Sequence, residues 1–186
     1  MPSKNKFKQQ YLIMSQIELF ITEILEGGVT VSVDEIQLVV FTLRMGEQIC
    51  EYGVPITQVQ EINRLTAPTK LPKAPAFVEG VINLRGKVIP VIDLKKRFEM
   101  ETGEYTDNSR IIVVDVDGRT VGIIVDEVNE VLRIPLSDVE PPPTFIEGVA
   151  VDYLKGVGKL GDRLLVLLDL NRILTRQEAS QLDQIA

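Results

Sequence analysis

The fold is decided by a stretch that occurs twice, first as Phe77-Val-Glu-Gly-Val-Ile-Asn-Leu-Arg-Gly-Lys-Val-Ile-Pro-Val-Ile-Asp-Leu94. It aligns without a gap with Tyr153-Leu-Lys-Gly-Val-Gly-Lys-Leu-Gly-Asp-Arg-Leu-Leu-Val-Leu-Leu-Asp-Leu170. Each copy has two short apolar runs around a turn, which is the pattern of a β-hairpin. Further upstream, turns at Gly46 and at Asp117-Gly118 predict one more hairpin each. The chain is therefore predicted to contain two similar halves.

Short strands separated by regular turns predict a mainly β fold with two small five-stranded barrels rather than a parallel α/β sheet. We expect an N-terminal extension over residues 1–34, a first barrel over 35–98 and a polar linker over 99–108. A second barrel should follow over 109–176, closed by a short C-terminal helix that begins at Asp169. Because each barrel core would be thin, the two barrels should pack on each other and leave a groove between them.

Residues 1–34 differ in pattern from the rest of the chain. Their apolar side chains fall near helical spacing, and Gly27-Gly28 would stop such a helix. Charged residues interrupt the apolar part, so the layout of a signal peptide is absent. The extension is interpreted as a frayed tail, a loosely docked helix or a targeting helix, and the sequence leaves these three alternatives open.

Composition removes several classes of function. A net charge of −7 would repel phosphate backbones and anionic membranes, so neither nucleic-acid binding nor direct membrane insertion is expected. The sequence has no histidine, which excludes His-based nucleophilic catalysis, histidine-ligated zinc and a phosphoaccepting histidine. The single cysteine, Cys50, lies in a strand-like run and is interpreted as a reduced, half-buried packing residue of a cytoplasmic protein.

Two patterns that suggest chemistry carry little weight in their context. Gly156-Val-Gly158-Lys-Leu-Gly161 satisfies the dinucleotide pattern G-x-G-x-x-G, but a strand-like run follows it where a helix is required. Three carboxylates, those of Asp126, Glu147 and Asp152, are candidates for a catalytic acid pair, although nothing fixes their spacing. We expect no cofactor and no metal site. An enzyme with a carboxylate site and a sensor that binds a small ligand in the groove are the competing classes.

A set of short motifs runs along the chain in a fixed order: Val59-Gln-Glu61-Ile62, Gly80 to Leu94, Val121-Gly-Ile-Ile-Val-Asp126, Tyr153-Leu-Lys-Gly156 and Leu160-Gly-Asp-Arg163. In order and spacing these motifs resemble the CheW-domain family, over about Ile36 to Leu174. The same domain occurs at the C-terminus of the kinase CheA and beside a receiver domain in CheV. The chain has no room for a kinase core or a receiver domain, so it is most similar to the stand-alone coupling proteins of the family.

The resemblance implies two five-stranded, SH3-like barrels and a non-catalytic adaptor in bacterial chemotaxis. The implied partners are the cytoplasmic tip of methyl-accepting chemoreceptors and the regulatory domain of the histidine kinase CheA. These partners would recruit a cytoplasmic protein to receptor arrays at the inner face of the membrane. The receptor-binding residues, carried over by position, are Val59, Glu61, Gly80, Arg85 and Val131. The kinase-binding residues, carried over in the same way, are Phe145 and Gly156.

The charged candidates have an alternative explanation in the structure of the chain itself. Arg85 precedes a turn at Gly86 and should be exposed, and an exposed arginine is usually solvated. Its planar guanidinium nevertheless suits bidentate pairing with a receptor carboxylate. Glu61 is equally placed to pair with a basic residue of its own surface.

The uncharged candidates have such alternatives too. Val59 and Val131 are as compatible with a core position as with an exposed one. Gly80 and Gly156 are interpreted as backbone requirements, since a side chain there would distort the barrel and abolish binding indirectly. Phe145 lies beside prolines and is compatible with a loop anchor or with an interface residue.

Overall fold

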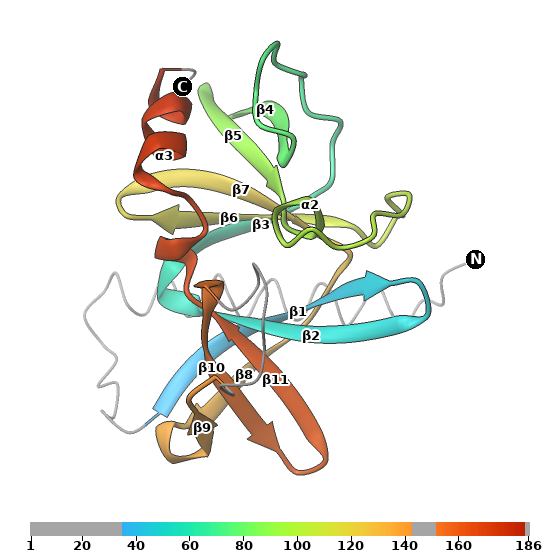
Figure 1. The fold of residues 1–186 in the computed structure, drawn as a ribbon, viewed down its shortest axis with the longest axis vertical. Coiled ribbons are helices and arrows are strands. Elements are labelled where there is room, and N and C mark those ends of the chain that lie inside the picture. Colours follow the sequence, from blue (N-terminus) through green and yellow to red (C-terminus); the bar gives the residue numbers. More distant parts are fainter. Residues whose placement is uncertain (1–34, 143–151, 185–186) are drawn as a thin grey trace.

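The computed structural model describes residues 35–142 and 152–184, and their strands form two curved sheets, one above the other in Figure 1. The upper sheet is called the five-stranded barrel here and has the strand order β3-β6-β7-β5-β4. Its strands are β3 (Val59–Arg64), β4 (Val78–Leu84), β5 (Lys87–Asp93), β6 (Arg110–Val116) and β7 (Arg119–Val125).

The lower sheet is called the six-stranded barrel and has the strand order β8-β1-β2-β11-β10-β9. Its strands are β1 (Glu35–Met45), β2 (Gln48–Pro55), β8 (Glu127–Pro135), β9 (Val139–Glu140), β10 (Leu154–Leu160) and β11 (Arg163–Leu168). The predicted mainly β fold of two small barrels is thus confirmed, and the sixth strand, β9, has only two residues.

Short helices connect or close the sheets. The 3-10 turns η1 (Ile56–Gln58) and η2 (Leu136–Asp138) each follow a proline at the end of a strand. Helix α2 (Leu94–Arg97) follows β5 and is capped by the Asp93 carboxylate. The predicted closing helix at Asp169 is wrong in extent, since that position starts only the 3-10 turn η4 (Leu170–Arg172). The C-terminal helix α3 (Arg176–Asp183) begins later, at a capping box formed by Thr175 and Glu178.

The predicted division into barrels over 35–98 and 109–176 is wrong. The hairpin β1–β2 from the first half pairs with β8 and β11, whereas the hairpin β6–β7 from the second half pairs with β3 and β5. The physical reason lies in the short connections, because β2 runs directly into η1 and β3, and only Asp126 separates β7 from β8. Each hairpin is therefore carried into the neighbouring barrel, and the halves exchange hairpins.

Strands that are buried on both faces explain the continuous apolar runs of the sequence. In β1, Leu38 and Val40 belong to the core of the six-stranded barrel, while Val39 and Phe41 face a second, shared core. In β6, Ile111 and Val113 belong to the core of the five-stranded barrel, while Ile112 and Val114 face the shared core. Successive side chains on a strand point to opposite faces, so one strand serves two cores. The barrels pack on each other as expected, with a large apolar cluster between them.

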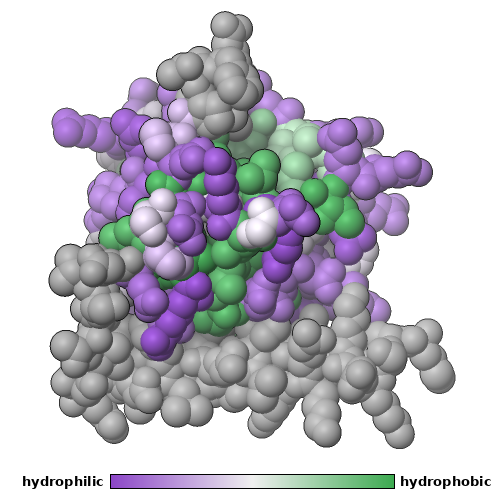
Figure 2. Space-filling view, turned by 90° about the horizontal axis from the view of Figure 1, so that it is seen from below, coloured by the Kyte–Doolittle hydropathy of each residue, from purple (hydrophilic) through white to green (hydrophobic). Residues whose placement is uncertain are grey.

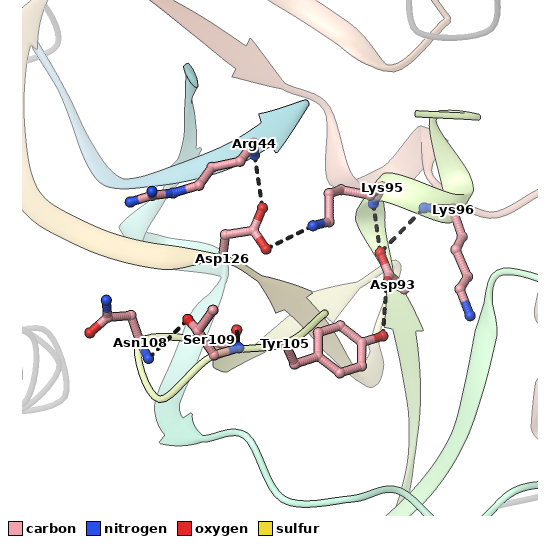
Figure 3. Close-up of polar contacts among 9 residues, drawn as sticks. Arg44, Asp93, Lys95, Lys96, Tyr105, Asn108, Ser109 and Asp126 are labelled. Carbon is pink, nitrogen blue, oxygen red and sulfur yellow. Dashed lines mark hydrogen bonds and ion pairs between the residues drawn. The ribbon is translucent and has the colours of Figure 1, made fainter. Parts of the chain in front are cut away.

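A buried polar bridge also joins the barrels, at the crossing point from β7 to β8 (Figure 3). One carboxylate oxygen of Asp126 accepts a hydrogen bond from the Arg44 backbone N–H at 2.8 Å, and the other pairs with Lys95 Nζ at 2.8 Å. Both partners of the ion pair are buried. Asp126 thereby connects β1 of one barrel with α2 of the other.

Candidate protein-docking surfaces

The predicted receptor-binding pair, Glu61 and Arg85, is brought together at one end of the five-stranded barrel. Arg85 lies in the two-residue turn between β4 and β5, where Arg85 and Gly86 have φ angles of 51° and 86°. Such a turn matches the twist of the flanking strands. Arg85 Nη2 donates to Glu61 Oε2 at 2.9 Å, so the pair joins the turn to the edge strand β3.

The two side chains of this pair differ in their exposure to solvent. The Arg85 side chain is 83% exposed, whereas that of Glu61 is only 20% exposed. Among the described residues, only Nη2 of the guanidinium has a polar contact, so its other N–H groups face solvent. Glu61 does pair with a basic residue of its own surface, one of the two alternatives that the sequence left open. We call this pair the Arg85 mouth.

The two valines do not share this exposure. Val59 is a core residue, with 4% exposure, and it belongs to the shared core between the barrels. Val131 lies in β8 of the other barrel, is half-buried and packs against the same core. Among the described residues, the interaction of Arg85 is with Glu61, and none joins it to either valine side chain. These valines hold the surface in shape rather than present an exposed apolar contact.

Gly80 and Gly156 occupy equivalent places at β-bulges in β4 and β10. Gly80 has a φ of +143°, and a Cβ atom there would overlap the backbone carbonyl oxygen of Thr69. A Cβ atom at Gly156 would lie 2.7 Å from the carbonyl oxygen of Glu140 and 2.9 Å from a methyl group of Val139. The interpretation of both glycines as backbone requirements is confirmed. Phe145, the other kinase-binding candidate, lies outside the described residues.

A second ion-paired mouth, which the sequence analysis missed, closes the end of the six-stranded barrel. Arg163, just after the β10–β11 turn, donates to both carboxylate oxygens of Glu51 in β2, at 3.1 and 2.8 Å. The same guanidinium donates to Glu130 Oε1 in β8 at 2.9 Å. These hydrogen bonds, with Glu51 as the largest contributor, raise the pKa of Arg163. We call this cluster the Arg163 mouth.

The surface around the end of the six-stranded barrel is apolar at its centre. Figure 2, seen from below, shows apolar side chains gathered there with polar side chains around them. The core of this barrel is surrounded by partly buried apolar side chains, those of Ile36, Leu132, Val139 and Leu160. An apolar centre with a polar rim is the arrangement found in protein–protein interfaces.

A pocket of about 330 Å³ lies between the barrels, beside the linker 99–108. Arg44, Lys95 and Asp126 contribute to its wall together with linker residues (Figure 3). The buried charges of Lys95 and Asp126 are already satisfied by each other and by the Arg44 N–H. These lining groups therefore offer no unpaired charge to a small ligand.

The described part of the chain bears on the metal, nucleotide, cysteine and membrane predictions. Within residues 35–142 and 152–184, no group of three or more acidic or cysteine side chains is placed to hold a metal ion. The G-x-G-x-x-G glycines lie in β10 and its turn, and a strand follows them. Cys50 is half-buried in β2, as predicted. No helix in this described part is long and apolar enough to cross a membrane.

The chain is similar to known proteins in sequence and in structure. The model of the CheW-like domain matches residues 37–178. A chemotaxis protein CheW of Klebsiella aerogenes is 38% identical over 150 residues, which cover 81% of this chain and 88% of the relative. A chemotaxis protein CheW of Treponema pallidum is 34% identical over 160 residues, which cover 83% of this chain and 92% of the relative.

A solved structure is similar as well. The crystal structure of the scaffolding protein TtCheW from Thermoanaerobacter tengcongensis superimposes with a TM-score of 0.67. It is 40% identical in sequence, and the match covers 74% of this chain and 91% of that one. Sequence and structure agree, and the chain belongs to the CheW-like domain family.

Proposed function

We propose that this chain is a non-catalytic adaptor of bacterial chemotaxis, which couples methyl-accepting chemoreceptors to the histidine kinase CheA. The observation that carries the proposal is Arg85, an 83% exposed guanidinium held on a rigid turn and paired through one nitrogen. A group that is fixed in position and still able to make new hydrogen bonds suits recognition. Family membership and relatives named chemotaxis protein CheW support the same function.

The receptor face uses the Arg85 mouth. A carboxylate on the cytoplasmic receptor tip pairs with the outward N–H groups of Arg85, while Glu61 holds the guanidinium from behind. Val59 and Val131 support this face from the shared core, and Gly80 sets the path of β4 beneath it. The receptor tip is a helical hairpin, and it docks in the helix-in-groove mode.

The kinase face lies on the six-stranded barrel around Gly156, with Phe145 from the neighbouring segment. Gly156 acts through the backbone, because it allows β10 to approach Glu140 closely. A side chain at this position displaces β9 and changes the surface that the kinase regulatory domain meets. The adaptor acts in the cytoplasm, is recruited to receptor arrays by its partners, and forms no covalent bond with them.

A three-component assay tests this function. We expect kinase activity to respond to a receptor signalling fragment only when kinase, receptor fragment and this chain are all present. Arg85→Ala and Glu61→Ala should each reduce that response while the far-UV circular dichroism spectrum stays unchanged. The matched control is Arg119→Ala, which removes an exposed arginine at another turn of the same barrel. A folded Arg85→Ala protein that couples as well as the wild type would remove Arg85 from the receptor face.

A further inference from the structure

The two mouths are copies of one arrangement. The segment Val59-Gln-Glu-Ile-Asn-Arg-Leu65, which begins in β3 and ends just after it, aligns without a gap with Val128-Asn-Glu-Val-Leu-Arg-Ile134 in β8. The aligned residues are identical or similar at every position except that of Asn63 and Leu132. Both strands carry a β-bulge at the second residue of the aligned segment, Gln60 or Asn129, and both place their glutamate opposite an equivalent valine of the neighbouring strand. Each glutamate then accepts a hydrogen bond of 2.9 Å from an arginine at the adjacent hairpin turn.

The correspondence extends to the other proposed receptor-binding residues of the five-stranded barrel. Val128 is equivalent to Val59, Glu130 to Glu61 and Gly156 to Gly80, while Arg163 takes the place of Arg85 in space. Gly156 is also the residue around which the kinase face is proposed. The kinase face is thus built on the same plan as the receptor face.

The two mouths differ in net charge because of one position. Glu51 in β2 is equivalent by register to Thr120 in β7. The Arg85 mouth therefore holds one carboxylate and one guanidinium, whereas the Arg163 mouth holds two carboxylates and one guanidinium. The first is neutral overall and the second carries one excess negative charge.

The extra carboxylate also changes which groups of the mouth are available for hydrogen bonds to a partner protein. Both Glu51 and Glu130 hold Arg163, whose side chain is 48% exposed, against 83% for Arg85. The side chains of Glu51 and Glu130 are 23% and 38% exposed. A carboxylate has about four lone-pair sites, so each can still accept a hydrogen bond from outside. This mouth therefore offers anionic oxygens as acceptors, beside the Nη1 N–H groups of Arg163, which have no partner among the described residues.

We infer that the Arg163 mouth, formed by Glu51, Glu130 and Arg163, is a docking site for a basic side chain on the surface of the kinase regulatory domain. This inference rests on the function proposed above and names the chemistry of its kinase face. Ile49, which is 60% exposed and lies on the same face of β2 as Glu51, supplies an apolar neighbour that shields the new ion pair from water. The two mouths then select opposite charges, a carboxylate at Arg85 and a cation at Arg163, which disfavours exchange of partners.

Calorimetric titration of the chain with the kinase regulatory domain tests this inference. Glu51→Gln and Glu130→Gln should each weaken binding by about 5- to 10-fold, the scale of a partly exposed interfacial charge pair. Arg163→Gln should weaken binding less than either, because it leaves both carboxylates in place. Asp183→Asn is the matched control, since it removes an exposed carboxylate that pairs with an arginine elsewhere on the surface, and it should leave the affinity unchanged.

The reverse ranking, with Arg163→Gln most damaging, would overturn the inference and indicate a carboxylate on the kinase. Unchanged affinity in all three variants, with receptor-fragment binding intact as a measure of folding, would also overturn it. In both of these outcomes the adaptor function stands, because the wild-type chain still binds the kinase. Failure of the wild-type chain to bind the regulatory domain would instead overturn the proposed function and, with it, this inference.

Discussion

The two barrel mouths share a backbone plan and differ in what they leave available. In the five-stranded barrel one glutamate holds Arg85, and most of the guanidinium faces solvent. In the six-stranded barrel two glutamates hold Arg163 through its Nε and Nη2 atoms. The difference shows that a duplicated fold can present two different charged surfaces when one residue changes beside an ion pair that both copies share, here Glu51 in place of Thr120.

Both mouths belong to one rigid body because the barrels are joined, and Asp126→Ala should weaken that connection most. The substitution leaves the Lys95 ammonium buried without a counter-charge and the Arg44 N–H without its acceptor. Loss of one partner of a buried ion pair costs about 3–5 kcal/mol. We expect a loss of this size in the free energy of unfolding, measured by urea denaturation. The double variant Lys95→Met/Asp126→Asn should lose less, and an equal or larger loss would contradict the bridging role.

The paired glycines test whether the barrels are equally constrained. Gly80→Ala should destabilise the chain by about 2–4 kcal/mol, because the new Cβ atom overlaps the Thr69 carbonyl oxygen and φ is +143°. Gly156→Ala should cost less, about 1–2 kcal/mol, since its φ lies outside the left-handed region and its Cβ atom would lie 2.7 Å from the Glu140 carbonyl oxygen, farther than a Cβ atom at Gly80 would lie from the Thr69 carbonyl oxygen. Urea denaturation of both variants measures the difference. Equal losses would mean that the two bulges are constrained alike.

The arginines should separate stability from recognition. Arg85→Ala and Arg163→Ala should each change the free energy of unfolding by less than about 1 kcal/mol, because both ion pairs are partly exposed. Arg163→Ala should cost the larger amount, since it breaks pairs with two carboxylates. Arg85→Ala should weaken binding of the receptor fragment by about tenfold, the loss of one charge-assisted hydrogen-bonded pair, measured by calorimetry. A larger loss of stability for Arg85→Ala would contradict the assignment of the two roles.

The shared core gives a small dependence of stability on pH. Tyr52 stacks on Phe41 and makes a tilted ring contact with Phe98, with ring centroids 6.0 Å apart in each pair. Burial, and next the nearby Cys50, raises its pKa to about 12 from an ordinary value of 10.0. The unfolded chain releases this proton first, so stability should fall as pH rises from 10 to 12. Thermal melts of the wild type and of Tyr52→Phe check this, and the same pH dependence in both would contradict the role of Tyr52.

Local structure was predictable from the sequence because local chemistry fixed it. The Asp117-Gly118 turn, the Asp93 cap and the apolar runs each follow from the conformational preferences of the residues involved. The repeat of Phe77 to Leu94 predicted that two similar barrels exist. It did not predict that they exchange hairpins, because strand pairing between distant segments depends on how short connections such as η1 cross from sheet to sheet.

The candidate site was predictable in part, for a related reason. Arg85 was expected to be exposed because it precedes a glycine turn, and the family resemblance pointed to Glu61 beside it. The second mouth was missed although its signal lies in the sequence, as the repeat that starts at Val59 and again at Val128. Its arginine follows the turn in one copy and lies within the turn in the other, so a gapless alignment does not reveal that Arg163 replaces Arg85 in space.

The central claim is that this chain works through two separate surfaces of one rigid pair of barrels. Sedimentation of the chain with a receptor signalling fragment and the kinase regulatory domain tests it most directly. We expect a single ternary species for the wild-type chain. Arg85→Ala should remove the receptor fragment from this species, and Glu51→Lys should remove the kinase domain. Mutually exclusive binding of the two partners, or loss of both from either variant while the chain stays folded, would contradict the claim.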